Sequence, residues 1–388
     1  MAITNKVGPP VTGEDFFGRK EELSRAHAYL NTNHSLTLSA PRRIGKSSFA
    51  KRLIEDKTKE GWNCVYVDLE GIRTKDDFLK ILLTKFDKSG IWTEASKAAG
   101  GVINRLLEGI KGIGPLNMDF SHYENSPKNY YNLLGNVINH DQHTLIVIDE
   151  LTLFLGVLDK NDPTHEEVAF FLNWFRSLRQ VLDSKIRWIF CGSVGLHNFT
   201  RSRNLSLTIN DLLSFDFDAL SYEEAFGLVK ALAASENIPI TDEIVEYLLK
   251  QLEWYIPYFI QLLFTNLKSY ASKENGVTEA LIDSVMDSLV RIKDFSSWSE
   301  RLSEYNGQEI GARLLLKELC KAENGFSREQ LLTVYTYYLP HSPLEAENEL
   351  SLILSMMEHD GYIMRTEGGK RRFRSPLLRK WWYYNFVE

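Results

Sequence analysis

Gly45, Lys46 and Ser47 are consecutive residues whose types suit the binding of a phosphate group. A glycine admits close approach of the backbone, a lysine neutralises phosphate charge, and a serine hydroxyl is a ligand for Mg²⁺. The residues end a loop before a helical pattern, where loop amides and a helix N-terminus supply further hydrogen-bond donors. They complete the pattern Gly-x-x-x-x-Gly-Lys-[Ser/Thr] except at Ala40, which replaces the first glycine. We predict nucleotide binding here; the alternative is a basic strand-to-helix turn.

Asp149 and Glu150 are adjacent carboxylates at the end of the apolar run Thr144–Ile148. A continuous apolar run without alternation is typical of a strand buried on both faces of a parallel sheet. Open α/β sheets bind ligands at the carboxyl ends of their strands. We predict that Asp149 and Ser47 hold Mg²⁺, the aspartate through water, and that Glu150 polarises an attacking water.

The elements that position these residues alternate between strands and helices, which predicts an α/β fold with a parallel sheet and helices on both faces. Expected strands are Leu36–Ser39, Cys64–Leu69, the run ending at Asp149, Ile186–Cys191 and Ser214–Leu220. Expected helices run over Lys20–Leu30, from the phosphate loop to Ile54, from a capping box at Thr74 to Phe86, and from a capping box at Thr164–Glu167 to Gln180.

Two polar residues near the later strands are further candidates for the site. Ser193 follows the strand beside Asp149 and could orient the water; the alternative is a serine that starts a turn. Arg201 and Arg203 are expected on a loop at Thr200–Asn204 before the last strand, and Arg203 could reach the γ-phosphate of a neighbouring subunit as an arginine finger. The alternative for both arginines is a solvated surface position.

Length and composition limit the kind of protein. A chain of 388 residues is expected to form two or three domains. Its net charge of −7 argues against a protein that coats nucleic acid along its whole length. No apolar run reaches bilayer length and the N-terminus lacks a signal-peptide pattern. Three widely spaced cysteines, Cys64, Cys191 and Cys320, fit a reducing cytoplasm.

The predicted domains are a P-loop core over 1–220, a helical lid over 221–305 and a winged-helix domain over 306–388. The core carries an insertion at 88–142, either a projection that faces a partner or extra helical packing on the sheet. Lid helices are expected after the capping box Ser221–Glu224 and at about 242–252, 256–270 and 279–292. Winged-helix elements are expected at Gly311–Lys321, Ser327–Leu339 and Leu344–His359, with a hairpin of Tyr362–Arg365 and Lys370–Arg374.

A winged helix raises the question of DNA binding, and the charges give a divided answer. Lys370, Arg371, Arg372 and Arg374 make the hairpin basic, so DNA contact through the wing is conceivable. The helix Leu344–His359, however, has no Lys or Arg and carries several glutamates, which would face phosphates in a groove. We therefore favour a protein-contact or autoinhibitory role over sequence-specific DNA reading.

Together these motifs make the chain similar to the archaeal-ATPase type of P-loop protein, a relative of AAA+ ATPases close to the signal-transducing STAND NTPases. The resemblance covers nearly the whole chain. Its motifs are Phe17-Gly18-Arg19, Ala40-Pro41-Arg42-Arg43-Ile44-Gly45-Lys46-Ser47, Asp149-Glu150, Gly192-Ser193, Ile256-Pro257-Tyr258 and Ser375-Pro376-Leu377-Leu378-Arg379.

The resemblance implies an AAA+-like (ASCE) sheet of five parallel strands with the P-loop strand central. It implies ATP with Mg²⁺ bound along Ala40–Ser48, a base held between Phe17-Gly18-Arg19 and Pro257, and switching between closed ADP and open ATP states. The chain departs from the family pattern at Ala40 and at Asn210-Asp211, where many relatives carry an arginine. The second departure argues against a finger in trans and against fast hydrolysis.

We therefore expect a cytoplasmic ATPase that turns over slowly and passes a conformational change to a protein partner or to its own oligomer. Antiphage defence or regulation of a neighbouring effector would suit such a switch by analogy. One alternative is a DNA-associated ATPase that acts through the winged helix in replication, transposition or transcription. Another is a nucleotide-binding scaffold that does not hydrolyse. ATP is favoured over GTP because no Asn-Lys-x-Asp motif is present.

Overall fold

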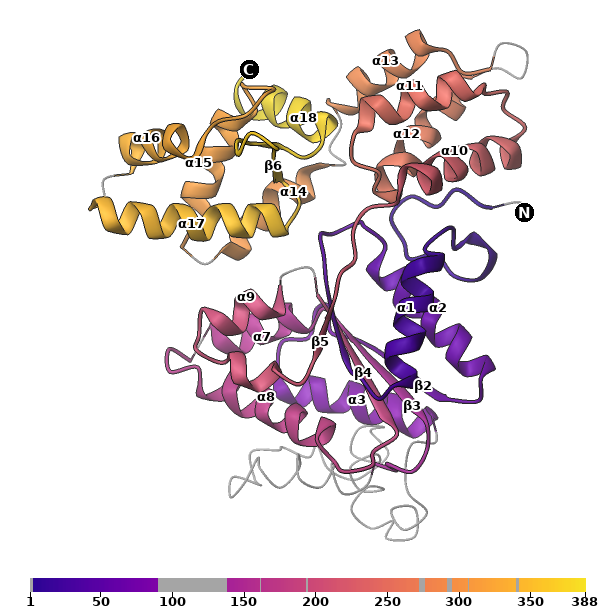
Figure 1. The fold of residues 1–388 in the computed structure, drawn as a ribbon, viewed down its shortest axis with the longest axis vertical. Helices are drawn as coiled ribbons and strands as arrows, with labels where there is room; N and C mark the ends of the chain where they lie inside the picture. Colours follow the sequence, from indigo (N-terminus) through magenta and orange to yellow (C-terminus); the bar gives the residue numbers. More distant parts are fainter. Residues whose placement is uncertain are drawn as a thin grey trace, which may run out of the picture. The chain divides into compact units, whose positions relative to one another are not determined.

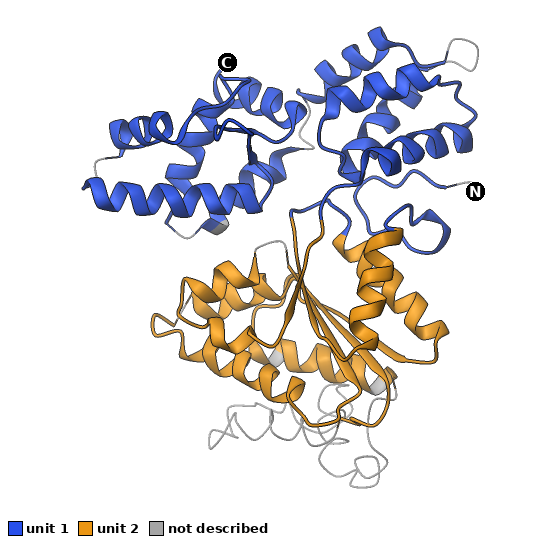
Figure 2. Cartoon of the chain, viewed as in Figure 1, with its two compact units in different colours: residues 1–19, 41–45, 218–388 blue, residues 20–40, 46–217 orange. Residues whose placement is uncertain are grey.

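The computed structural model describes most of the chain, namely residues 3–89, 138–160, 162–192, 195–271, 276–291, 295–305, 307–339 and 342–388. Ser193 and most of the expected insertion at 88–142 lie outside the described residues. Within the described ranges, no helix is long and apolar enough to cross a membrane. The chain divides into two compact units, residues 20–40 with 46–217 and residues 1–19 with 41–45 and 218–388 (Figure 2).

The first unit contains a parallel sheet of five strands in the order β2-β3-β4-β1-β5 (Figure 1). The strands are β1 Leu36–Ser39, β2 Asn63–Asp68, β3 Thr144–Asp149, β4 Ile186–Gly192 and β5 Leu213–Phe215. The expected α/β parallel sheet is confirmed, with one correction. β1, which leads into the P-loop, lies inside the sheet between β4 and β5, but the middle strand is β4.

The two faces of the sheet carry different residues because side chains alternate along each strand. Val65, Val67, Ile146 and Ile148 share one face and join the large apolar core that α3, α7 and α8 complete. Tyr66 and Asp149 therefore point to the opposite face, where α1 and α2 lie (Figure 1). The helices of this unit are α1 Lys20–Asn31, α2 Lys46–Lys59, α3 Lys75–Ser89, α7 Leu151–Asp159, α8 Glu166–Arg179 and α9 Leu196–Arg201, with a 3₁₀ turn η3 Ser206–Ile209.

Three local expectations in this unit were wrong. The residue before α8 is His165, which makes no side-chain cap, and Asp162 instead accepts hydrogen bonds from the amides of Thr164 and Glu167. The last strand ends at Phe215 rather than Leu220, because its partner β1 is short and the last residue pair between them is Leu38 with Phe215. Arg201 lies in the last turn of α9, not on a loop.

After the last strand of the sheet, the chain of the second unit forms four consecutive helices. They are α10 Tyr222–Glu236, α11 Asp242–Leu252, α12 Pro257–Tyr270 and α13 Glu279–Leu289, as the helical patterns predicted. Ser221 accepts from the amide of Glu224, whose side chain accepts from the amide of Ser221, so the expected capping box is confirmed. Pro257 occupies the first turn of α12, where its missing N–H costs no hydrogen bond.

The C-terminal region of the same unit combines helices with a short antiparallel hairpin. Its elements are α14 Ser296–Glu300, η5 Arg301–Tyr305, α15 Glu309–Leu319, α16 Arg328–Tyr338, α17 Pro343–His359, β6 Ile363–Arg365, β7 Arg371–Phe373 and α18 Pro376–Phe386. The Ser327–Gln330 capping box is confirmed. The order of elements is the one predicted, and the winged-helix classification and the domain limits stay predictions.

Residues 295–305, which we assigned to the lid, contact both groups of helices. The Trp298 ring lies edge-on to Trp254, just before α12. The backbone carbonyl of Trp298 accepts a hydrogen bond from the buried hydroxyl of Tyr362, 2.5 Å away. Arg301 forms a buried ion pair with Asp360 at 3.1 Å. The segment therefore ties the C-terminal region to the helices before it.

Candidate functional site

Lys46 and Ser47 open helix α2 directly after the phosphate loop, as the motif requires. Lys46 is buried, and its Nζ donates to the carbonyl of Ala40 at 2.6 Å. The ammonium group is thus held at the end of β1. Ala40 is also buried and is absent from the described residues with positive φ, so a methyl group fits where the pattern has glycine.

Ser47 and Asp149 meet across the sheet face, although they are far apart in sequence. Ser47 Oγ donates to Asp149 Oδ2 at 2.7 Å. The other carboxylate oxygen, Oδ1, accepts from the amide of Glu150 at 3.0 Å. Only 2% of the Asp149 surface is exposed, so its charge is fixed in place by these donors. The structure therefore joins the two residues that we predicted as metal ligands.

Glu150 occupies a strained backbone position between β3 and α7. Its φ of 53° and ψ of 33° are left-handed, which costs a residue with a side chain about 1–2 kcal/mol. Left-handed residues outside glycine often occur at functional sites. Here the turn ends the strand at Asp149 and starts helix α7 at Leu151, so Glu150 lies between the two elements.

The donor set of this site fits a magnesium ion. Mg²⁺ prefers hard oxygen ligands and is usually held by one or two protein groups together with substrate phosphates and water. Ser47 and Asp149 supply a hydroxyl and a carboxylate oxygen in direct contact. In the described ranges, no cluster of three or more His, Cys, Asp or Glu offers an all-protein metal cage.

The other half of the phosphate loop, residues 41–45, belongs to the second unit. Gly45 has a φ of 102°, which only glycine adopts without strain, and a Cβ there would lie 3.9 Å from Pro257. The guanidinium of Arg43 lies 4.2 Å from the centre of the Tyr258 ring. Ile256-Pro257-Tyr258, predicted to face the nucleotide, is therefore next to the loop.

Phe17, Gly18 and Arg19 lie against the same unit. Phe17 packs on Gly227 of α10. Gly18 has a φ of 71°, and a Cβ added there would lie 2.9 Å from Oε1 of Glu224. Arg19 is buried, and its guanidinium donates to the carbonyls of Ile44 at 3.1 Å and Asp218 at 2.6 Å. Arg19 thus ties the phosphate loop to the chain that enters helix α10.

The remaining predicted phosphate-binding residues continue the same stretch of chain. Pro41 is buried, Arg42 and Ser48 are half-buried, and Arg43 is exposed. Ser48 follows Ser47 in the first turn of α2, where backbone amides have no partner within the helix. Their predicted contacts with nucleotide stay predictions.

Comparison with known proteins identifies the fold. No protein-family model matches the sequence, and no curated protein matches it. Among solved structures, the chain is similar to the Walker-type ATPase paby2304 of Pyrococcus abyssi, with 14% identity, a TM-score of 0.64, and coverage of 97% of this chain and 99% of that one. The chain shares the fold of this Walker-type ATPase.

Two further structures match over similar lengths. The Aeropyrum pernix ORC2 protein, solved as ADPNP-ADP complexes, has 14% identity, a TM-score of 0.43 and coverage of 99% and 97% of the two chains. The RuvB Holliday junction branch migration motor of Thermotoga maritima has 12% identity, a TM-score of 0.46 and coverage of 94% of each chain.

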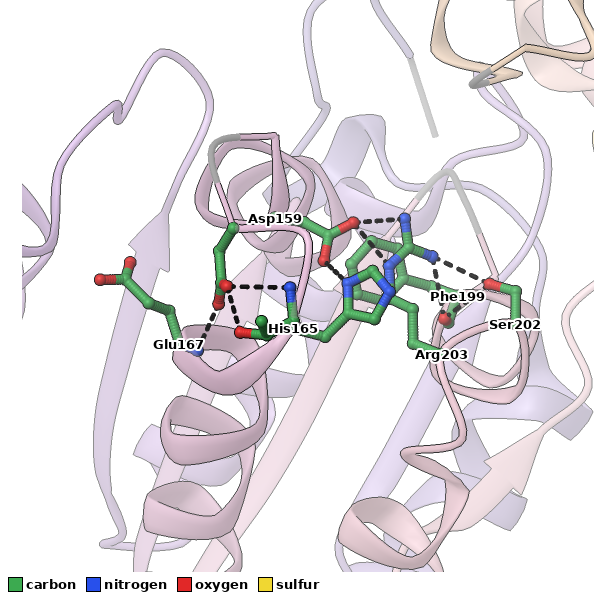
Figure 3. A network of polar contacts seen from close by, with 8 residues as sticks. Asp159, His165, Glu167, Phe199, Ser202 and Arg203 are labelled. Carbon is green, nitrogen blue, oxygen red and sulfur yellow. Dashed lines mark hydrogen bonds and ion pairs between the residues drawn. The ribbon is translucent and has the colours of Figure 1, made fainter.

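Arg203, the candidate finger of this P-loop fold, is held by an internal network (Figure 3). Its guanidinium donates to Asp159 Oδ2 at 2.7 Å, to the carbonyl of Phe199 at 3.1 Å and to Ser202 Oγ at 2.9 Å. It also lies 3.8 Å from the centre of the Phe199 ring. The other oxygen of Asp159 is 2.5 Å from His165 Nδ1. A finger role in trans therefore requires that Arg203 leave Asp159.

Tyr66 is a residue of the site that we did not predict. Its hydroxyl donates to the Asp149 carboxylate from the neighbouring strand β2. A signal was present: with Cys64–Leu69 read as a strand paired to the one ending at Asp149, the alternation places Tyr66 on the same face as Asp149. The pairing register, which the sequence alone does not give, decides whether the hydroxyl reaches the carboxylate.

Proposed function

We propose that this chain is a Mg²⁺-dependent ATPase that works as a molecular switch. The observation that carries the proposal is the 2.7 Å hydrogen bond between Ser47 and Asp149, which brings the P-loop hydroxyl to the carboxylate after the buried strand. The strand order of the sheet also supports the proposal, since β4 lies between the P-loop strand β1 and β3, which carries Asp149.

Each residue has a separate task in this proposal. The loop amides and Lys46 bind the β- and γ-phosphates, which requires the Nζ of Lys46 to exchange the Ala40 carbonyl for phosphate. Ser47 and Asp149 hold the metal, which when bound neutralises the charge on the phosphates. Glu150 accepts a proton from water, and its place on a strained turn fixes the direction of its carboxylate.

The output of the switch is proposed to be a conformational change that reaches a protein partner or another copy of the chain. Arg19 supports this, because it links the phosphate loop at Ile44 to Asp218, just before helix α10 and the predicted lid. A change at the phosphates that moves the loop would shift the same guanidinium. Antiphage defence or regulation of a neighbouring effector stays a setting suggested only by analogy.

The pairing of the wing arginines argues against DNA as the partner. Arg371 pairs with Glu358 at 3.2 Å, Arg372 with Glu253 at 2.7 Å and Arg374 with Asp218 at 2.6 Å. A phosphate backbone would have to displace these carboxylates. Of the basic wing residues, Lys370 lies at the hairpin turn beside β7 and adds one charge.

The test compares ATP turnover with and without double-stranded DNA over a range of salt. We expect that DNA does not stimulate ATP turnover and does not bind with an affinity that falls as the salt concentration rises. DNA binding with a linear dependence of log affinity on log salt, lost in a triple Arg371→Ala, Arg372→Ala and Arg374→Ala variant, would favour the DNA-associated alternative instead.

A further inference from the structure

Two hydroxyl groups converge on one oxygen of Asp149. Tyr66 Oη donates to Asp149 Oδ2 at 2.5 Å, and Ser47 Oγ donates to the same atom at 2.7 Å. The third donor, the amide of Glu150, occupies Oδ1. The orientation of the carboxylate is therefore set by groups from three elements, namely β2, α2 and the turn after β3.

Strand register explains why Tyr66 makes this contact. Asp68 lies directly opposite Asp149, and Tyr66 lies opposite Val147, one pair earlier on the same face. A long side chain reaches the diagonal neighbour on the next strand. Asp68 does not compete for the position, since its carboxylate accepts from the amide of Glu70 at 2.9 Å.

The Tyr66 hydroxyl has a chemical environment that strengthens the bond. Asp149 is buried, with 2% of its surface exposed, and a carboxylate can only accept, so the Tyr66 hydroxyl is the donor in this contact. A hydrogen bond from a neutral donor to a buried carboxylate is shorter and stronger than one between neutral groups. The Tyr66 hydroxyl is therefore a charge-assisted donor to Asp149.

The ring of Tyr66 also contacts the helix that carries Ser47. Lys51 Nζ lies 5.3 Å from the centre of the ring. Lys51 is one helical turn after Ser47 on α2, so both residues lie on the same side of that helix. Tyr66 thus fixes the carboxylate of β3 relative to the helix that supplies the second metal ligand.

We propose that Tyr66 is a positioning residue for the magnesium site, holding Asp149 in the orientation that a metal shared with Ser47 requires. The inference rests on the proposed function of the site. Residues that hydrogen-bond to metal ligands set the orientation of those ligands, and their loss typically lowers metal affinity by about 10–100-fold. Tyr66 acts through Asp149 and has no direct role toward phosphate or the attacking water.

The test uses Tyr66→Phe, which removes only the hydroxyl. Binding of a fluorescent ADP analogue is titrated with MgCl₂, and the magnesium concentration at half-maximal binding is measured. We expect this midpoint to rise about tenfold in Tyr66→Phe, whereas binding of the analogue in EDTA is unchanged. Unchanged binding in EDTA also shows that the variant is folded.

Tyr335→Phe is the matched control. The Tyr335 hydroxyl donates to Glu349 at 2.6 Å in the C-terminal region, so this variant loses a bond of the same kind outside the P-loop core. A general loss of stability would affect both variants, but only Tyr66→Phe should move the magnesium midpoint. Equal midpoints in Tyr66→Phe and wild type would overturn the role of Tyr66. Failure of wild type to bind the analogue with magnesium would instead overturn the proposed function itself.

Discussion

Arg203 donates to Asp159, the last residue of helix α7, at 2.7 Å, and α7 starts directly after Glu150. One short helix thus links the proposed catalytic carboxylate to the candidate finger. A change at Glu150 that shifts α7 would move Asp159 and alter its hold on Arg203. The pair offers a physical route from the proposed catalytic carboxylate to Arg203.

Release of Arg203 is predicted to raise turnover in a manner that depends on protein concentration. Asp159→Asn weakens the ion pair, so more Arg203 is available to a neighbouring subunit, and turnover per subunit should rise more steeply with concentration than in wild type. Arg203→Ala should remove the part of the turnover that rises with protein concentration. If Arg203 acts as a finger, turnover in the assembled state should fall by about 10³-fold. Steady-state ATP turnover over a dilution series measures both effects.

Arg201→Ala is the control for this prediction, because Arg201 is an exposed arginine of α9 two residues away. It should behave as wild type. Equal turnover by Arg203→Ala and wild type at every concentration would exclude the finger role and leave the Asp159 pair as a structural contact.

Asp211 is predicted to contribute stability that disappears in acid. Burial alone raises the pKa of Asp211, but its hydrogen bonds and ion pair with Arg179, at 2.7 and 2.9 Å, outweigh burial and leave the pKa below its ordinary value of 3.8. A lowered pKa in the folded state stabilises the protein above the unfolded pKa, and this stability is lost as the pH falls through the folded value.

The expected result for Asp211→Asn is a loss of about 0.2–1 kcal/mol in the free energy of unfolding at neutral pH, because solvent screens this partly exposed ion pair, and a much smaller loss near pH 2. Urea unfolding at several pH values measures the difference. Asp287→Asn, at an exposed position of α13, controls for loss of a charge. The account of the pair would be wrong if Asp211→Asn lost as much stability in acid as at neutral pH.

The Asp211 pair also explains a departure noted in the sequence. Many proteins that the chain resembles carry an arginine where this chain has Asn210-Asp211. Here the position is used for a carboxylate that anchors α8 through Arg179. The finger candidate is thus Arg203, which lies seven residues before Asn210 and is already engaged with Asp159.

Gly361 is predicted to tolerate a methyl group poorly, for two separable reasons. Its φ of 81° costs any other residue about 1–2 kcal/mol, and an added Cβ would overlap the Trp254 ring and lie 3.0 Å from Pro41. Gly361→Ala should therefore lower the free energy of unfolding by more than backbone strain alone, with roughly 1–3 kcal/mol added by overpacking.

Gly369→Ala separates these two contributions. Gly369 has a similar φ of 76°, but an added Cβ there meets nothing closer than the end of the Arg365 side chain at 3.9 Å. It should show the backbone cost only. Equal unfolding free energies of the two variants, measured by denaturant titration, would mean that the turn at Gly361 does not pack against Trp254 and Pro41.

Much of the site could be predicted because its chemistry is local in sequence. Lys46 and Ser47 depend on a contiguous loop, and Asp149 and Glu150 on a single apolar run followed by carboxylates. Long-range pairing was harder to predict. Tyr66 reaches Asp149 only because β2 pairs with β3 in one register, and neither residue carries a local signal of the other.

The errors in the fold have similar causes. The length of β5 is limited by its partner β1 rather than by its own residues, whose alternation of apolar and acidic side chains continues past Phe215. Asp162 replaces Thr164 as the residue that caps the start of α8, because its side chain reaches two amides at once. Helix α7 was missed because only Asp149 and Glu150 separate its apolar residues from those of the strand before it.

The central claim is tested most directly by ATP turnover of wild type, Lys46→Ala and Glu150→Gln, with nucleotide binding and molecular mass measured on the same samples. Lys46→Ala should lose nucleotide binding. Glu150→Gln should keep binding, lose turnover by about 10²–10⁴-fold as expected for a general base, and accumulate with ATP in one assembly state. Turnover by Glu150→Gln equal to that of wild type would contradict the account, since hydrolysis would then not depend on the carboxylate after β3.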